Sequence, residues 1–328
     1  MKRICAALLL ACLLLAACGM EMVAAREFFA MDTLMQVKVW GSAEAADDAR
    51  QELLRLEKLL SVTSKDSDIS RLNLNQTATV CEETAVLLQT ALALSARTGG
   101  AFDPTVYPLV QLWGFTEETQ HVPQHDALQA ALARVSTENV IVSGSKVELK
   151  NGAQIDLGAI AKGYAAERCA ALLAAADIKA ALLSLGGNVQ TVGSKPDGTK
   201  WAIGIADPAQ PTHSLATLRF TGSLALVTSG GYQRYFEEDG VRYHHILDPE
   251  TGMPAQSGLA SVTILADSGT LADALSTALF VMGLEKATEF WRASDDFEAV
   301  FITDSGDIFA TQGAASFLND CEFQVIAR

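Results

Sequence analysis

The stretch at residues 156–167 places the strongest constraint on how this chain folds. An apolar run at residues 153–157 predicts a strand, which breaks at Gly158 and passes into an alanine-rich helix ending near Asp177. A carboxylate, a glycine turn, a helix start and Lys162 therefore lie within a few residues. Such a junction suits a phosphate or a metal ion, because helix N-terminal amides and the helix dipole favour an anion. An ordinary strand–turn–helix connection gives the same pattern, so this stretch alone leaves both interpretations open.

The first residues indicate an export signal. Lys2 and Arg3 precede an apolar run at residues 4–15 that is too short to span a bilayer. The run ends in Leu-Ala-Ala-Cys, which resembles a bacterial lipobox, so Cys18 is expected to carry a lipid after cleavage. A plain signal cut near Ala25 is the alternative.

These features predict three regions: a lipoprotein signal peptide and lipobox cysteine at residues 1–18, a spacer at 19–26, and a folded domain at 27–328. The last is either a single domain or two closely joined lobes. The lipid on Cys18 would anchor the protein at the extracytoplasmic face of the cytoplasmic membrane.

The charge and the cysteines narrow the function classes. The formal net charge is −15, and no cluster of five or more basic residues occurs, which argues against nucleic acid as a partner. Cys81, Cys169 and Cys321 are spaced too widely for a zinc site or a disulfide framework. Cys169 lies in an alanine-rich helical stretch and is expected to be a small buried residue. A single disulfide stays open as an alternative.

Helical and strand patterns both recur along the chain, and the second half is rich in strands, so an α+β fold is predicted. Residues 61–75 are expected to form a loop, and residues 140–149 a hairpin. Helices are expected at residues 44–60, 82–98, 126–135, 272–283 and 284–293. Strands are expected at residues 28–40, 180–185, 189–192, 201–206, 215–220, 224–227, 261–265, 299–302, 308–311 and 322–327.

Two further segments suggest a binding site. Residues 101–115 are apolar and aromatic but contain two prolines and a glycine, which forbid a long regular element. The segment is expected either to wall a pocket for a planar ring or to cover the core. His244 and His245 are adjacent, and adjacent strand residues face opposite ways, so at most one of them points into a given site.

Asp273 and Thr277 are four residues apart on a predicted helix and therefore share one face. A carboxylate and a hydroxyl are hard oxygen ligands, which suit Mg²⁺ or Ca²⁺. The alternative is an Asp N-cap followed by a Thr that bonds back along the helix.

Taken in order, these segments resemble the motifs of the ApbE family of bacterial flavin transferases, the FAD:protein FMN transferases. The resemblance runs from Met31 to about Gly283. It rests on Met31-Asp32-Thr33, Phe102-Asp103-Pro104 through Leu112-Trp113-Gly114-Phe115, Asp156-Leu157-Gly158 through Ala161-Lys162-Gly163-Tyr164, Leu185-Gly186-Gly187-Asn188, Thr228-Ser229-Gly230, His245 through Asp248-Pro249 to Thr251-Gly252, and Asp273 to Thr277. It implies an α+β fold with mixed, largely antiparallel sheets and flanking helices.

The family's activity, as the resemblance implies it, is Mg²⁺-dependent cleavage of the FAD pyrophosphate. FMN passes to a Thr or Ser hydroxyl of an extracytoplasmic partner protein, and AMP is released. Two alternatives use the same features: Mg²⁺-dependent hydrolysis of FAD to FMN and AMP, and a lipoprotein that binds flavin without chemistry. The Asp273/Thr277 pair argues against the last, because a protein that only binds flavin needs no metal at the leaving group.

The resemblance also assigns individual residues. Asp273 and Thr277 match side-chain ligands of magnesium, and Ala159 matches a position that contributes its backbone carbonyl. His245 matches a histidine suited to accept a proton near neutral pH, and Lys162 would add positive charge at the phosphates. The positions that match FAD contacts are Met31, Ala101, Phe102, Asp103, Asp156, Lys162 and Leu247.

The chain departs from the family's pattern at three positions. Thr63 stands where the family often has Tyr, Asp32 where Gly is common, and Gly231 where Asp is frequent.

Overall fold

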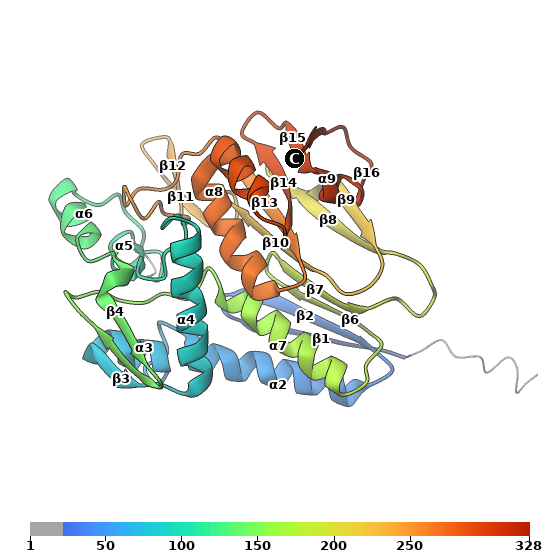
Figure 1. Cartoon of the computed structure of the whole chain (residues 1–328), viewed down its shortest axis with the longest axis horizontal. Helices are drawn as coiled ribbons and strands as arrows, with labels where there is room; N and C mark the ends of the chain where they lie inside the picture. Colours follow the sequence, from blue (N-terminus) through green and yellow to red (C-terminus); the bar gives the residue numbers. More distant parts are fainter. Residues whose placement is uncertain (1–21, 118) are drawn as a thin grey trace, which may run out of the picture.

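A computed structural model describes residues 22–117 and 119–328 (Figure 1). Within this part of the chain, nine strands form one sheet in the order β1-β2-β6-β7-β10-β13-β14-β15-β17. Neighbouring strands are antiparallel except β15 and β17, which are parallel. The strands span β1 Val23–Ala30, β2 Thr33–Trp40, β6 Ala180–Leu185, β7 Asn188–Gly193, β10 Ala225–Gly230, β13 Leu259–Ala266, β14 Glu298–Thr303, β15 Ile308–Thr311 and β17 Gln324–Ile326.

Strands β6 and β13 are apolar at most positions because both of their faces are largely buried. In β13, Ile264 belongs to the larger core on one face, while Leu265 belongs to a second core on the other face. Successive side chains of a strand point to opposite sides, so one strand serves both cores.

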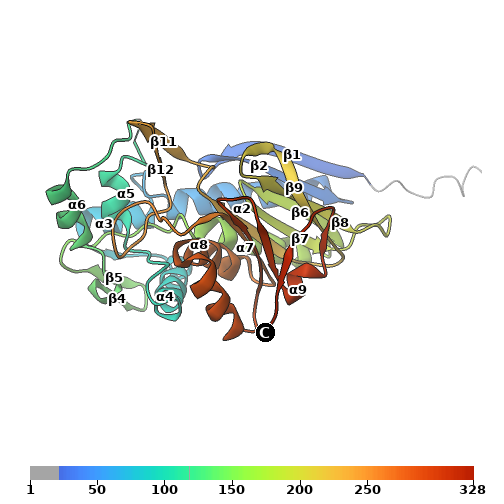
Figure 2. The same ribbon diagram turned by 90° about the horizontal axis from the view of Figure 1, so that it is seen from above.

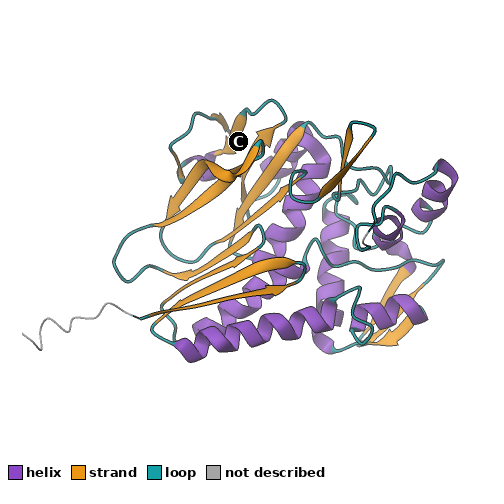
Figure 3. Ribbon diagram, turned by 180° about the vertical axis from the view of Figure 1, so that it is seen from behind, coloured by secondary structure: helices purple, strands orange, loops and turns teal. Residues whose placement is uncertain are grey.

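Long helices cover the first face (Figures 1 and 3). They are α2 (Ala43–Leu60), α7 (Ala161–Ala175) and α8 (Gly269–Arg292). A smaller antiparallel sheet covers the second face, made of β8 (Trp201–Asp207), β9 (Gln210–Phe220) and β16 (Leu318–Asn319). Its Trp201 and Leu218 pack in the second core, next to the short helix α9 (Gln312–Ala315).

The remaining elements lie beside the helices, at the end of the molecule away from β8 and β9 (Figures 1 and 2). A third small core there is built around the buried Leu109, Trp113 and Leu247. The elements are α3 (Asp68–Asn75), α4 (Glu82–Arg97), α5 (Tyr107–Leu112), α6 (His125–Leu132), the 3-10 turn Thr137–Asn139, the sheet of β3 (Thr77–Thr79), β4 (Val140–Ser143) and β5 (Lys146–Leu149), and the hairpin of β11 (Tyr235–Glu238) and β12 (Val241–His244).

The α+β prediction, with largely antiparallel sheets and flanking helices, is confirmed. The hairpin at 140–149 and the strand at 180–185 form as expected. The two expected C-terminal helices meet at Gly283, whose φ of 76° and ψ of 168° break the helical path of α8.

Four predictions were wrong in detail. The single strand expected at residues 28–40 is two strands, β1 and β2, joined by a turn at Met31 and Asp32. The expected signal peptide, Cys18 and the first residues of the expected spacer lie outside the described residues. The spacer was predicted too long, because β1 already begins at Val23 and pairs with β2. The expected loop at 61–75 contains α3, which begins where the Ser67 hydroxyl accepts the Ser70 N–H at 2.9 Å.

The apolar run at 153–157 is not a strand. Its backbone is satisfied by other partners: Ile155 exchanges two hydrogen bonds with the Asn73 side chain, and the Asp156 N–H donates to the Pro104 carbonyl. Residues 153–157 are therefore a largely buried segment without regular secondary structure.

In the described part of the chain, no helix is both long and apolar enough to cross a membrane. Cys81, Cys169 and Cys321 are free thiols there. Cys169 is buried, as expected for a small residue inside a helix, and burial raises the pKa of its thiol to about 12.

Candidate active site

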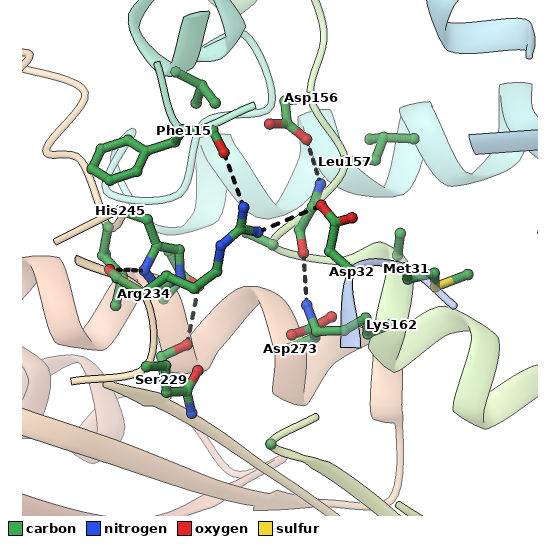
Figure 4. A pocket seen from close by; sticks show the side chains of 18 of the residues that line it. Met31, Asp32, Phe115, Asp156, Leu157, Lys162, Ser229, Arg234, His245 and Asp273 are labelled. Carbon is green, nitrogen blue, oxygen red and sulfur yellow. Dashed lines mark hydrogen bonds and ion pairs between the residues drawn. The ribbon is translucent and has the colours of Figure 1, made fainter. Parts of the chain in front are cut away.

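A cavity of about 670 Å³ opens between the helices, the β1–β2 turn and the third small core. Every residue that the sequence assigned to the site lines this cavity: Met31, Ala101, Phe102, Asp103, Asp156, Ala159, Lys162, His245, Leu247, Asp273 and Thr277. Figure 4 shows Asp156, Lys162, His245 and Asp273 converging from separate segments. The fold therefore brings these residues together, whereas their individual roles remain predictions.

Two helices carry the centre of the site, and each caps the other. The Gly163 N–H, in the first turn of α7, donates to Asp273 Oδ2 of α8 at 2.8 Å. In return, Glu167 Oε2 of α7 accepts the Thr270 N–H at 3.0 Å and the Ser268 hydroxyl at 2.7 Å. Orphan N–H groups at both helix starts thereby find carboxylate partners. The anion that the N-terminus of α7 binds is thus the protein's own Asp273.

The mutual capping requires a very close approach of the two helices. A Cβ atom on Gly163 would lie 2.1 Å from the Gly269 carbonyl oxygen and 2.5 Å from Asp273 Cβ. Only glycine fits there, because backbone and a packed side chain leave no room.

Gly163→Ala is therefore expected to destabilise the protein by about 1–3 kcal/mol through overpacking. In an ordinary helix interior the same change stabilises the protein by about 1 kcal/mol. A loss of stability would therefore support the close contact between the helices. Urea unfolding measures it, with Ala174→Gly on the exposed face of α7 as the gauge of intrinsic helix propensity. Equal or greater stability of the alanine variant would contradict the contact.

The oxygen atoms around Asp273 fit a hard divalent cation. Asp273 is 3% exposed, and its Oδ1 accepts a hydrogen bond from Asn188 at 3.3 Å. The Thr277 hydroxyl lies 3.2 Å from that of Ser229, and Ala159 lines the same cavity. No group of three His, Cys, Asp or Glu suited to a metal occurs in the described residues. Magnesium needs few protein ligands, because it keeps waters and ligand phosphates in its shell.

Electrostatics support the same conclusion. Among the described residues that line the cavity, five are acidic, at positions 32, 57, 103, 156 and 273, and two are basic, at 162 and 234. A cation bound among these residues would reduce the repulsion between this lining and an anionic ligand. Asp273, Thr277 and the Ala159 carbonyl are the groups that would hold it.

The segment before α7 is held by short-range bonds. The Gly158 N–H donates to Asp156 Oδ1 at 2.7 Å, and Lys162 Nζ donates to the Gly158 carbonyl at 3.1 Å. Burial raises the pKa of Asp156, and burial likewise raises the pKa of Asp103, whose Oδ1 accepts from the Thr105 N–H. Both carboxyl groups therefore hold a proton more strongly than the carboxyl group of an exposed Asp.

His244 and His245 diverge, as the strand pattern predicted. His244 packs edge-on against Phe280, and its Nε2 lies 3.0 Å from the Ala255 carbonyl oxygen. His245 faces the cavity and lies edge-on to Phe115, with ring centroids 6.4 Å apart.

The protonation state of His245 follows from its neighbours. Its Nδ1 lies 3.1 Å from the Arg234 carbonyl oxygen, which can only accept, so Nδ1 carries the hydrogen and Nε2 keeps a lone pair. Burial and the nearby Arg234 guanidinium lower the pKa of His245 to about 3. The imidazole is therefore neutral near pH 7 and able to accept a proton at Nε2.

This depressed pKa predicts an acid-sensitive stability. Below pH 6.5 the unfolded chain protonates His245 while the folded state does not until about pH 3, so stability falls across that window. His245→Asn should remove about 1.5 kcal/mol of the loss between pH 6.5 and 5. Urea unfolding at both pH values measures it, with the exposed His213→Asn as control. Identical pH slopes for the wild type and His245→Asn would show that burial does not depress this pKa.

Three lining residues had no assigned role in the sequence. Ser229 and Asn188 lie in motifs that were recognised, but only the folded chain places them against Thr277 and Asp273. Arg234 gave no sequence signal. Its guanidinium donates to the Phe115 carbonyl at 2.9 Å and lies 3.8 Å from Asp32 (Figure 4).

The structure explains two of the three departures from the family's pattern. Asp32 has a φ of +58°, a region that glycine prefers and that Asp tolerates better than most residues. A Cβ atom on Gly231 would lie 2.9 Å from His244 Cδ2, so a larger residue needs the ring to move. Thr63 lines the cavity and hydrogen-bonds to the Ser61 hydroxyl at 3.0 Å.

The segment at 101–115 serves both functions considered for it. Phe102, Val106 and Phe115 line the cavity, while Leu109 and Trp113 fill the third core behind it. The Trp113 indole N–H donates to the Gly252 carbonyl at 2.8 Å, which ties the cavity wall to the loop after His245.

A cavity of this size, with an apolar and aromatic wall, clustered charges and oxygen atoms suited to a cation, is typical of an enzyme that acts on a large ligand. The sequence model of the ApbE family matches residues 31–301. The chain belongs to the ApbE family, as the motifs predicted, and is therefore an enzyme of the flavin transferase class.

Individual relatives agree with this assignment. The chain is 37% identical over 306 residues to the FAD:protein FMN transferase of Treponema pallidum, covering 86% of this chain and 84% of that one. It is 34% identical over 286 residues to the FAD:protein FMN transferase of Escherichia coli K12, covering 84% and 81%.

Solved structures show the same fold. The ApbE protein of Thermotoga maritima superposes with a TM-score of 0.86 at 35% identity, covering 91% of this chain and all of that one. The apo flavinyl transferase ApbE of Pseudomonas stutzeri gives 0.80 at 30% identity, covering 90% and 97%.

Proposed function

We propose that this chain moves FMN from FAD to a Thr or Ser hydroxyl of a partner protein and releases AMP. The observation that carries the proposal is the convergence, in one cavity, of a hard-cation site, Lys162 and a neutral His245. The relatives' names, FAD:protein FMN transferase, support the same substrate and product. A bound Mg²⁺ would supply charge stabilisation at the phosphates, worth several kcal/mol in such reactions.

The protein's own residues would divide the work. His245 Nε2 takes the proton from the acceptor hydroxyl, whose oxygen forms a bond to the FMN phosphorus while the bond to the AMP oxygen breaks. Lys162 places positive charge beside the phosphates, because its Nζ is tethered to the Gly158 carbonyl at the start of α7. The aromatic and apolar wall from Phe102 to Phe115 offers a surface for the isoalloxazine ring.

The experiment follows covalent flavin and AMP together. Residues 22–328 are incubated with FAD, Mg²⁺ and a candidate acceptor domain that contains an exposed Thr. Covalent flavin on the acceptor supports transfer, and AMP without it supports the alternative, hydrolysis of FAD to FMN and AMP. Tight FAD binding with neither product would make the protein a flavin binder without chemistry.

We also propose that a lipid on Cys18 anchors the mature protein at the extracytoplasmic face of the cytoplasmic membrane. The lipobox-like residues 15–18 support this proposal. Cys18→Ser in the full-length chain should release the protein from the membrane fraction. A variant that stays in that fraction and still carries lipid would contradict it.

A further inference from the structure

An ion pair spans the cavity between two segments that are far apart in sequence. Asp32 belongs to the turn between β1 and β2, and Arg234 follows β10. Their charged atoms, Asp32 Oδ2 and Arg234 Nη1, are 3.8 Å apart, and both side chains are largely exposed, at 73% and 50% (Figure 4). Both residues line the cavity in which the substrate is proposed to bind.

Arg234 is well placed to meet a phosphate. Nη2 donates to the Phe115 carbonyl at 2.9 Å, which fixes the direction of the guanidinium, while Nη1 makes the longer contact with Asp32. Guanidinium groups match phosphate oxygens in geometry and charge, and such bonds are stronger than neutral ones. Exposed ion pairs, in contrast, change an equilibrium only about 1.5- to 5-fold.

We propose that Arg234 binds a phosphate oxygen of the flavin nucleotide and that Asp32 competes for the same guanidinium. The Asp32–Arg234 pair then sets the affinity for the phosphate-bearing part of the ligand, and the ligand must displace Asp32 to gain this contact. The proposal rests on FAD being the substrate but not on transfer, because binding in EDTA is measured without turnover.

The test is a double-substitution cycle read by flavin fluorescence. The dissociation constants of FAD and riboflavin are measured in EDTA for wild type, Asp32→Asn, Arg234→Met and the double variant. Asn keeps the shape of Asp and tolerates the positive φ at position 32. Riboflavin carries no phosphate, so it reports whether the ring site is intact.

We expect Asp32→Asn to tighten FAD binding about threefold at low salt and less at high salt. Arg234→Met should weaken it about tenfold or more, since a hydrogen bond to a charged group is lost. In the Arg234→Met background, Asp32→Asn should have no effect. The riboflavin constants should stay the same in all four proteins.

A matched control is available in the same chain. Arg219 and Asp320 form an exposed pair at 3.6 Å, Asp320 also has a positive φ of 68°, and neither residue lines the cavity. Arg219→Met and Asp320→Asn make the same charge changes and should leave FAD binding unaltered.

Two outcomes would overturn the proposal. If Asp32→Asn increases the affinity for FAD equally in the presence and absence of Arg234, its effect comes from long-range charge and not from competition for the guanidinium. If Arg234→Met weakens the binding of riboflavin as much as that of FAD, the arginine acts only by stabilising the cavity wall at Phe115. Arg234→Lys is the second variant, and it should bind FAD with intermediate affinity while its riboflavin constant is unchanged.

Discussion

Asp273→Asn is expected to lower Mg²⁺-dependent AMP release from FAD by about a thousandfold. The substitution keeps the shape of the side chain and one acceptor oxygen, but it removes the negative charge of the proposed cation site. Loss of several kcal/mol of charge stabilisation corresponds to a rate loss of this size. The measurement is AMP release over a magnesium titration, where the variant should fail to respond at any concentration that saturates the wild type.

Stability gives a second readout for the same substitution. Asp273 also caps α7 through the Gly163 N–H, so the loss of its charge should cost about 1 kcal/mol in urea unfolding without metal. Glu285→Gln, an exposed carboxylate further along α8, is the control and should change neither measurement. Wild-type AMP release by Asp273→Asn would remove this residue from the metal site.

His245→Gln should lower transfer of FMN to the acceptor by about a hundredfold to ten-thousandfold, the range expected for loss of a general base. FAD binding should persist, because Met31, Phe102 and the other cavity residues proposed to contact FAD are unchanged. The variant should therefore have a Kd for FAD within about twofold of the wild-type value, while the amount of covalent flavin on the acceptor falls.

His213→Gln, an exposed histidine on β9, is the matched control for this change. A second check is the pH dependence of transfer. If His245 accepts the proton from the acceptor hydroxyl, transfer by His245→Gln should recover partly as the pH rises, because hydroxide can then take that proton. Unchanged transfer at pH 7 would leave the proton acceptor to be sought among other residues of the cavity.

Several strands of the sheet, such as β6 and β13, could be predicted from the sequence, because they are apolar runs that adjoin glycine turns. Residues 180–185 are one example, since both faces are buried and the pattern is continuous. The start of the first strand was placed too late, at residue 28, because Arg26 and Glu27 resemble a polar spacer, although their backbone pairs with β2.

The candidate site was predictable wherever a residue belongs to a motif and hidden wherever its role depends on tertiary contacts. The convergence of residues 156–162 with Asp273 followed from the family's motifs. The capping of α8 by Glu167 and the contact of Arg234 with Asp32 involve partners about 100 and 200 residues away in the chain. The spacing of motifs and the periodicity of apolar residues do not predict contacts between residues so far apart in the chain.

The exchange of caps between α7 and α8 has a practical consequence for anyone who wants a stalled enzyme with substrate bound. Asp273 is an unsuitable position for that purpose, because the carboxylate proposed to bind the cation also caps α7, so its removal should destabilise the fold as well as stop the reaction. Among the described residues, the His245 ring hydrogen-bonds to a backbone carbonyl at the cavity wall. A trapped complex for crystallisation is therefore best sought with a substitution at position 245.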